Sequence, residues 1–518
     1  MFQAGGVPAR AALTPTDRTM CKVTMESHLN PLEQFRHDLD GNDCVARLQG
    51  GLIGDGVTID GPFGKKPLIY ADYVASGRAL RQVEDFVAAH VLPFYANTHT
   101  EESYCGAYST QLREDARNTI AGLVGAGPDC NVIFTGSGAT AGLNRIVNLL
   151  DIATLVRAGK KVRILVGPYE HHSNLLPWRE TGAEVIEVPE AATGGPDMAI
   201  LEDHLTAAGN YDMVVGSFSA ASNVTGIVTD TDAVTALLKR HGALAIWDYA
   251  GGAPYLPMAM EPREDCRKDA IVFSGHKFPG GPGASGVTVL RDTVVRRATP
   301  TLPGGGSVSY VTPWSHAYST NVSEREEAGT PNVIGDIRAV LAMLVKDAIG
   351  GDFIARRGEA LRQRALAVWS KNPAIEILGN PGATDRLPIF SFRIRDKDGA
   401  VLHHQLFTRM LSDVHGIQAR GGCACAGPYG HTLLGIGRDA SDAILARLKD
   451  AHEIEKPGWV RLNFSYLLSD DKADYIIRSV DDLARNASDY SRSYVSDGMS
   501  ARFEPMAGVT QHEEKAAV

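Results

Sequence analysis

The sequence FSGHKFPGGPGASG, residues 273–286, joins an apolar strand to a turn rich in glycine and proline. The run Ala270 to Phe273 predicts the strand, and Lys277 follows its end. Glycines and small residues around Lys277 let the backbone approach a ligand closely. A lysine in such a crowded, partly dry loop can lose its proton and attack a carbonyl group. Because a solvated lysine after a strand is the commoner case, the upstream sequence has to decide between the two interpretations.

Upstream, apolar runs alternate with helical periods, which is typical of an α/β domain. The runs are rich in β-branched residues and lack polar alternation, which predicts strands buried on both faces of a mostly parallel sheet. Ligands in such folds bind at the carboxyl ends of the strands. The predicted strands are Val132 to Thr135, Val162 to Val166, Glu184 to Val188, Met213 to Phe218, Leu244 to Trp247, Ala270 to Phe273 and Gly286 to Leu290, and the clearest helices are Thr140 to Leu155 and Thr231 to Arg240.

The chain divides into an extension, two domains and a tail. Residues 1–65 form the N-terminal extension, whose first 30 residues, rich in Ala, Gly, Thr and Pro, are expected to be disordered. Residues 66–335 form the large domain, residues 336–490 a smaller α+β domain to which the start of the chain can contribute, and residues 491–518 a flexible tail. Further expected elements are helices at Pro31 to Arg47, Ala79 to Val91, Ile334 to Ile349, Phe353 to Trp369, Leu402 to Asp413 and Ala473 to Asn486, and strands at Lys66 to Val74, Pro388 to Ile394 and Trp459 to Phe464.

The composition is that of an ordinary globular protein, with 44% apolar and 22% charged residues in a chain of 518. A formal net charge of −10 and the lack of a Lys/Arg run argue against binding to nucleic acid. Seven thinly spread cysteines do not form a disulfide framework, which favours a reducing compartment. No apolar stretch is long enough to span a membrane. We therefore expect a soluble, cytoplasmic protein with no membrane or nucleic-acid partner.

Three further segments follow predicted strand ends. Asp248 ends the strand before Lys277, and an acidic residue buried there needs a cationic partner. In EHHSN, from Glu170, adjacent histidines point apart and no third ligand is evident, so stacking of an imidazole on an aromatic ligand is favoured over a metal site. TGSGAT, residues 135–140, exposes backbone N–H groups and a helix N-terminus, as a phosphate site does. This turn lacks the P-loop lysine and the dinucleotide spacing.

Together, a lysine, an aspartate, an aromatic stacker and a phosphate cradle describe a pyridoxal phosphate site. In such a site the lysine forms the Schiff base and the aspartate keeps the pyridine nitrogen protonated, so that the ring accepts electrons. The turn around Gly138, Ala139 and Thr140 would hold the phosphate. No metal is expected. Each of these residues, taken singly, has an ordinary structural explanation, such as a salt bridge for Asp248. The combination of the residues predicts the cofactor.

From about Leu68 to Ala484 the sequence resembles the class V aminotransferase family, in particular its cysteine desulfurase and selenocysteine lyase branch. The resemblance implies fold type I of the pyridoxal-phosphate enzymes: a large three-layer αβα domain with a mostly parallel sheet, and a smaller α+β C-terminal domain. It implies a small amino acid as substrate, a homodimer, and a protein that accepts the sulfur.

The resemblance also implies roles for single residues. SGHK makes Lys277 the Schiff-base lysine and Ser274 and His276 phosphate contacts. EHHSNLLPW makes His171 the residue that stacks on the cofactor, and Asp248 falls at the position of the pyridinium partner. SNVTG, from Ser222, places Asn223 beside the ring, and EAGTPN, from Glu327, makes Thr330 a contact to the partner subunit's phosphate. One position departs from the family: Gly251 stands where many desulfurases carry a glutamine that bonds the phenolic oxygen of the ring.

RGGCACAGP, from Arg420, bears on the reaction. It resembles the desulfurase segment in which a cysteine five residues after an arginine forms the persulfide, which implies Cys425 as nucleophile and Arg420 as a candidate anchor. Positive charge near Cys425 could favour its thiolate. Two ordinary loop cysteines, or a Cys-x-Cys metal or redox pair with Cys423, are the alternatives. Arg461, in WVRLNFS, resembles the arginine that grips the substrate carboxylate, which suits its bidentate fork, and a structural salt bridge is the alternative.

The expected function is thus removal of sulfur, or selenium, from an amino acid through a persulfide on Cys425. Another class V activity, as an aminotransferase, epimerase or C–S lyase, would keep Lys277 and be indifferent to Cys425. A catalytically silent scaffold or sulfur-relay partner is a further alternative, against which the intact set of Lys277, Asp248 and His171 argues.

Overall fold

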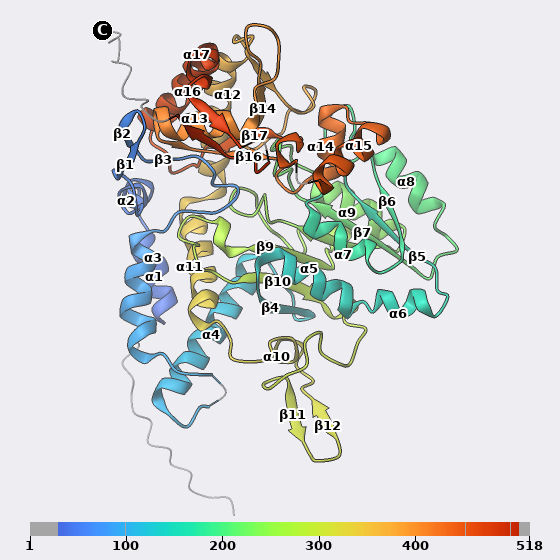
Figure 1. Cartoon of the computed structure of the whole chain (residues 1–518). Coiled ribbons are helices and arrows are strands. Elements are labelled where there is room, and N and C mark those ends of the chain that lie inside the picture. The colour runs from blue at the N-terminus through green and yellow to red at the C-terminus, as the bar shows by residue number, and fades with distance from the viewer. Residues whose placement is uncertain (1–29, 99, 451, 498, 507–518) are drawn as a thin grey trace, which may run out of the picture.

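The structure is a computed structural model that describes residues 30–98, 100–450, 452–497 and 499–506. The segment expected to be disordered, residues 1–30, therefore lies outside the described residues except for Asn30. Figure 1 shows a large domain built on one central sheet, with a smaller domain from the C-terminal part of the chain packed above it.

The large domain is built on a sheet of seven strands, and every predicted strand from Val132 to Leu290 belongs to it. The sheet is parallel except for β10, which runs antiparallel to both of its neighbours, β4 and β9. The connection from β9 to β10 contains one 3-10 turn, Gly275–Lys277, and no α-helix, so it does not make the crossover that parallel neighbours need. In spatial order the strands are β4 (Cys130–Gly136), β10 (Gly286–Arg291), β9 (Ala270–Ser274), β8 (Leu244–Asp248), β7 (Met213–Ser219), β5 (Val162–Val166) and β6 (Glu184–Glu187).

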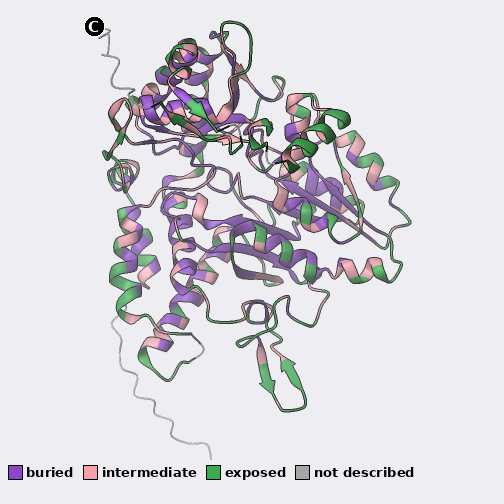
Figure 2. Ribbon diagram, viewed as in Figure 1, coloured by how far each residue is buried: buried purple, intermediate pink, exposed green. Residues whose placement is uncertain are grey.

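Helices cover both faces of this sheet because its strands are apolar on both sides. Val272 packs on one face with the inner side of α5 (Gly138–Leu149), and its neighbours Ile271 and Phe273 face the opposite layer. That layer contains α4 (Tyr104–Leu123), α9 (Thr231–Arg240) and the almost fully buried α11 (Val333–Ile349). Figure 2 shows the sheet and the inner helix faces as one buried region. The three layers predicted from unalternating strands are present.

Two expected helices are each interrupted by a turn. The helix expected from Thr140 to Leu155 is α5 followed by α6 (Ile152–Arg157), because Asp151 between them adopts a left-handed conformation with φ of 54°. The helix expected over 31–47 is α1 (Pro31–Leu39) followed by α2 (Cys44–Gly50). The remaining helices and hairpin strands of this half are α3 (Arg81–Phe86), α7 (Leu176–Arg179), α8 (Met198–Thr206), α10 (Val322–Glu326), β1 (Thr58–Gly61), β2 (Gly64–Pro67), β11 (Val308–Val311) and β12 (His316–Tyr318).

The smaller domain is an antiparallel sheet covered by helices, as expected for an α+β unit. Trp369 packs against Phe390 and Phe464 in its separate hydrophobic core. α11 packs on the large sheet, and the chain changes core within the helix that follows, where Ile354 belongs to the large core and Leu361 to the smaller one. The sheet order is β13 (Ile375–Ile377), β14 (Ile389–Ile394), β17 (Trp459–Asn463) and β16 (Arg420–Gly422), and the helices are α12 (Gly351–Trp369), α13 (His404–His415), α14 (Gly427–Leu434), α15 (Arg438–Lys449), α16 (Asp470–Arg485) and α17 (Ala487–Ser491).

The segment of β3 and the C-terminal end of the described chain both attach to this smaller domain. The strand expected from Lys66 to Val74 is divided: its first two residues belong to β2, and Ile69–Tyr70 form β3, which pairs with β15 (Ile417–Gln418) and takes no part in the large sheet. The tail expected to be flexible contains a hairpin of β18 (Tyr494–Ser496) and β19 (Phe503–Pro505). Tyr494 is buried, and its hydroxyl donates to Asp413 over 3.1 Å, which anchors the hairpin.

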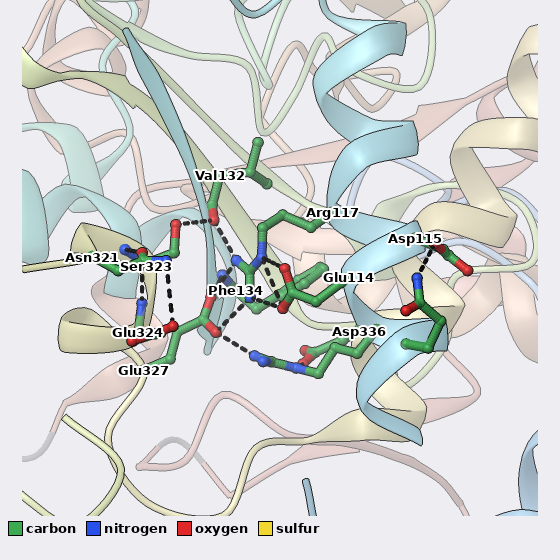
Figure 3. A network of polar contacts seen from close by, with 12 residues as sticks. Glu114, Asp115, Arg117, Val132, Phe134, Asn321, Ser323, Glu324, Glu327 and Asp336 are labelled. Carbon is green, nitrogen blue, oxygen red and sulfur yellow. Dashed lines mark hydrogen bonds and ion pairs between the residues drawn. The ribbon is translucent and has the colours of Figure 1, made fainter. Parts of the chain in front are cut away.

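A buried network of charges connects α4, β4 and α11 (Figure 3). The Glu327 carboxylate accepts hydrogen bonds from Arg113, from Arg117 at 2.9 Å and from the Phe134 N–H at 2.6 Å. Arg113 also pairs with Asp336 at 2.7 Å. The side chain of Glu327 is only 6% exposed. Because Glu327 begins the EAGTPN segment, the network fixes that loop against the core of the large domain.

Loss of the Glu327 charge should destabilise the large domain, because it leaves two buried arginines without their shared counterion. We expect Glu327→Gln to lower the free energy of unfolding by about 3 kcal/mol. Urea denaturation followed by fluorescence measures this, with Glu102→Gln at an exposed position as the control. A midpoint for Glu327→Gln equal to that of the control would show that the network does not stabilise the fold.

Candidate active site

A cavity of about 260 Å³ lies where the carboxyl ends of β7, β8 and β9 face the smaller domain. This is the edge at which parallel α/β sheets bind their ligands. The cavity brings together most of the residues that the sequence predicts. Those that line it are Lys277, Asp248, His171, Asn223, Ser274, His276, Ala139, Thr140, Arg420, Arg461 and Cys425.

Lys277 and Asp248 lie at adjacent strand ends. Lys277 closes the single turn that follows β9, and burial lowers its pKa to about 8, with opposing effects from Asp248, which raises it, and Arg461, which lowers it. Burial raises the pKa of Asp248, while the hydrogen bond from the Ala250 N–H at 2.7 Å and the charge of Lys277 lower it. The pair therefore combines a lysine that loses its proton near pH 8 with a buried acidic group.

His171 is held as a neutral imidazole. Its Nδ1 accepts the Ser173 N–H at 3.1 Å, so the ring proton lies on Nε2. Burial lowers the pKa of His171 to about 4, assisted by the positive charge of Lys277. The Ser173 hydroxyl lies 3.0 Å from Nδ1 and 2.6 Å from the Thr140 hydroxyl, which links the histidine to the first turn of α5.

The turn at the start of α5 fits a phosphate group. The Ala139 N–H donates to Ser274 Oγ at 3.0 Å, and Gly138 has φ of +64°. A Cβ on Gly138 would come within 2.6 Å of Ser274 Oγ, so only glycine allows this approach. Gly138 thus lies directly behind the cavity wall rather than in it. Helix N–H groups, hydroxyls and the neighbouring His276 are the donors that phosphate requires.

The opposite side of the cavity carries two arginines joined by a carboxylate that sequence analysis missed. Asp72 accepts Arg461 Nη2 at 2.9 Å on one oxygen and Arg420 Nε at 2.8 Å on the other. Arg461 is 4% exposed, donates from Nη1 to the Asn223 carbonyl at 3.2 Å, and has no hydrogen-bond partner at Nε. Asp72 has no motif of its own, and its one signal is a charge at the end of the apolar run before Tyr73.

The two neighbouring cysteines have different surroundings. Cys425 is exposed and lines the cavity, whereas Cys423 packs against an apolar cluster that includes Tyr169 and Trp459. Ala424 and Cys425 both adopt left-handed conformations, with φ of 51° and 55°. The Asn223 side chain donates to the Ala424 carbonyl at 2.9 Å, so it contacts the cysteine loop as well as lining the cavity.

Two of the positions singled out from the sequence have no side chain that reaches into this cavity. Gly251 lines the cavity but has no side chain to reach a ligand. Thr330 is exposed and is not among the residues that line this cavity, so its expected phosphate contact stays a prediction that needs a second subunit. Within residues 30–506, apart from the undescribed positions 99, 451 and 498, no cluster of three or more metal-binding side chains is found. No helix of the described chain is long and apolar enough to cross a bilayer.

Sequence comparison identifies the family. Residues 69–440 match the family described as Aminotransferase class-V. A probable cysteine desulfurase of Vibrio cholerae is 30% identical over 369 residues, which cover 70% of this chain and 85% of that protein. A probable cysteine desulfurase of Streptomyces coelicolor is 29% identical and covers 70% of this chain and 84% of its own length.

Solved structures agree on the fold. The apo structure of a cysteine desulfurase from Thermococcus onnurineus superimposes with a TM-score of 0.65 at 23% identity and covers 80% of this chain and 94% of its own. The cysteine desulfurase CsdA of Escherichia coli, in an S-sulfonic acid form, gives 0.63 at 22% identity and covers 85% and 98%. These likenesses confirm the predicted large αβα domain and smaller α+β domain of fold type I. With a family match over most of its length, the chain belongs to the aminotransferase class-V family.

Proposed function

We propose that this protein is a pyridoxal-phosphate-dependent cysteine desulfurase, which removes sulfur from cysteine, or selenium from selenocysteine, as a persulfide or its selenium counterpart. The observation that carries the proposal is a thiol, Cys425, in the same cavity as Lys277, Asp248 and His171. Relatives that cover most of this chain are described as cysteine desulfurases. Class V enzymes that lack sulfur chemistry have no need of the thiol.

The residues present fit the cofactor. Lys277 would carry it, Asp248 would hold a proton at the ring nitrogen, and neutral His171 would stack on the ring. The start of α5 with Ser274 and His276 would hold the phosphate, with Thr330 of a second subunit. When bound, the cofactor supplies an electron sink for negative charge that develops at the substrate's α-carbon. Gly251 leaves the phenolic oxygen of the ring without the family's glutamine.

The two arginines of the cavity would bind the substrate. Arg461 is buried with an unpaired Nε, and Arg420 has its outer nitrogens free of Asp72, so the two can bind the α-carboxylate of an amino acid. Asp72 would orient both guanidinium groups. Lys277, with a pKa of about 8, is suited to accept the proton from the α-carbon and to return one later.

Cys425 would carry out the sulfur transfer. Its thiolate attacks the substrate sulfur, an S–S bond forms, and the bond between carbon and sulfur breaks. The electron pair left on carbon is protonated, so that cysteine and Cys425 thiol become alanine and Cys425 persulfide. The outer sulfur then passes to the thiol of an acceptor protein by exchange.

We also propose that the protein acts as a homodimer in the cytoplasm. The β11–β12 hairpin projects from the body of the large domain (Figure 1), and its tip exposes Tyr310, Val311 and the 90% exposed Trp314. Exposed apolar side chains of this size favour a partner surface. The hairpin leads into the loop of Thr330, which the homodimer would place at the second active site. Free cysteines in the described chain suit a reducing compartment.

Replacing Lys277 tests the cofactor. We expect Lys277→Ala, purified from cells with ample cofactor, to lack the absorbance of a lysine-linked pyridoxal phosphate and to form no alanine from cysteine. The exposed control Lys160→Ala should be coloured and active. An unchanged spectrum for Lys277→Ala would refute the cofactor assignment.

Replacing Cys425 tests the reaction. With cysteine in a panel of amino acids, we expect Cys425→Ser to form alanine at least about a hundredfold more slowly, because the nucleophile is removed. The visible spectrum should not change. Cys423→Ser is the matched control and should be active. Alanine, pyruvate and sulfide are measured separately, since pyruvate as the main product would indicate a C–S lyase. Alanine formation by Cys425→Ser at the parent rate would exclude the persulfide route.

Titration of Lys277 tests its role as a base. In cofactor-free protein, we expect the amine to be acetylated with a pH dependence centred near its pKa of about 8. Because the Asp248 carboxylate raises this pKa, Asp248→Asn should move the profile to lower pH. Peptide mass spectrometry of Lys277 after brief labelling measures both profiles. A profile for Asp248→Asn at higher pH would contradict this arrangement.

A further inference from the structure

The loop that carries Cys425 holds an unfavourable backbone conformation. Two consecutive residues with side chains, Ala424 and Cys425, lie in the left-handed region, which crowds Cβ against the backbone. Such residues keep this conformation only where surrounding contacts impose it. The structure must therefore contain groups that hold the loop from outside.

His172 provides two of these contacts, one at the nucleophile itself and one two residues after it. The His172 N–H donates to the Cys425 carbonyl at 2.8 Å, and the Gly427 N–H donates to His172 Nε2 at 3.0 Å. Gly427 is the first residue of α14, where N–H groups have no partner within the helix. A Cβ on Gly427 would lie 3.0 Å from Nε2, so the loop and the imidazole are closely packed. Asn223 adds the third contact, at Ala424.

The surroundings of His172 keep Nε2 available as an acceptor. The side chain is part-buried, and burial lowers its pKa, as do the positive charges of Arg179 from α7 and of Lys456. Burial and these two charged groups disfavour a second proton on the imidazole. At neutral pH the bond from Gly427 is thus retained.

We propose that His172 is the positioning residue for Cys425: its backbone N–H holds the carbonyl of the nucleophile, its Nε2 holds the N–H of Gly427 two residues further on, and together they hold the thiol at the cavity. This rests on the proposed function, which makes Cys425 the nucleophile, and adds a role for the second histidine of EHHSN. The adjacent His171 faces the cavity, so one dipeptide would set both the stacking surface and the place from which sulfur is attacked.

The test compares His172→Leu, which removes the acceptor, with His172→Gln, whose amide oxygen can replace Nε2. Loss of one hydrogen bond of ordinary strength predicts about tenfold faster hydrogen exchange of the amides in 423–430 of the cofactor-loaded His172→Leu protein. We expect kcat for alanine formation to fall about tenfold as the loop loses its position, with KM for cysteine and the visible spectrum unchanged. His172→Gln should restore most of both losses. His241→Leu, at a surface histidine of the large domain, is the control.

A second variant avoids reliance on a single substitution. Gly427→Ala leaves His172 intact but presses a methyl group on Nε2, and it should speed exchange of the same amides. Unchanged exchange in both His172→Leu and Gly427→Ala, or no recovery in His172→Gln, would overturn the proposal. The assay of alanine formation separates this proposal from the proposed function. If the parent protein forms no alanine while the variants still differ in hydrogen exchange, the reaction assignment fails and the positioning role of His172 stands. If the parent protein forms alanine but the variants show no difference in hydrogen exchange, the reaction assignment stands and the proposed role of His172 fails.

Discussion

The structure depends on one backbone contact, at Gly286. This residue pairs on one side with Gly136 at the end of β4 and on the other with Ser274 at the end of β9. A Cβ at Gly286 would lie 2.4 Å from the Cα of Gly138, so no larger residue fits. The contact therefore fixes the distance between two turns, the one at the start of α5 and the one that carries Lys277. The two ends of a bound cofactor, phosphate and carbonyl carbon, require such a fixed separation.

Most of the large domain follows from local sequence. Its strands carry unalternating β-branched runs, and the motifs of Lys277, Asp248 and His171 each follow such a strand, so the edge where these residues meet could be predicted without knowing their contacts. The antiparallel course of β10, the break at Asp151 and the pairing of β3 with β15 could not, because they depend on connection length, a single dihedral angle and a partner far along the chain. The same holds for Asp72 and His172. Their importance comes from residues hundreds of positions away in the sequence.

The cavity balances charge by pairing each ionised group with a fixed neighbour. Asp72 lies between the two arginines, Asp248 faces Lys277, and the histidines stay neutral through burial. For the buried members, Asp248, Lys277 and Arg461, such pairing matters most, since an isolated buried charge is costly. The smaller domain supplies the arginines and the thiol, and the large domain supplies the lysine and its acidic partner. Catalysis as proposed therefore requires the two domains to keep their present packing.

The Asp72 bridge has a consequence for selectivity. Two guanidinium groups and one internal carboxylate leave a single net positive charge at that end of the cavity. If the arginines bind the substrate as proposed, one α-carboxylate neutralises it. Aspartate or glutamate would bring a second negative charge into a space whose remaining cation, Lys277, already faces Asp248, and the desolvation of that charge would go uncompensated. A site that binds its substrate in the proposed way would disfavour acidic amino acids through charge, whatever the shape of their side chains.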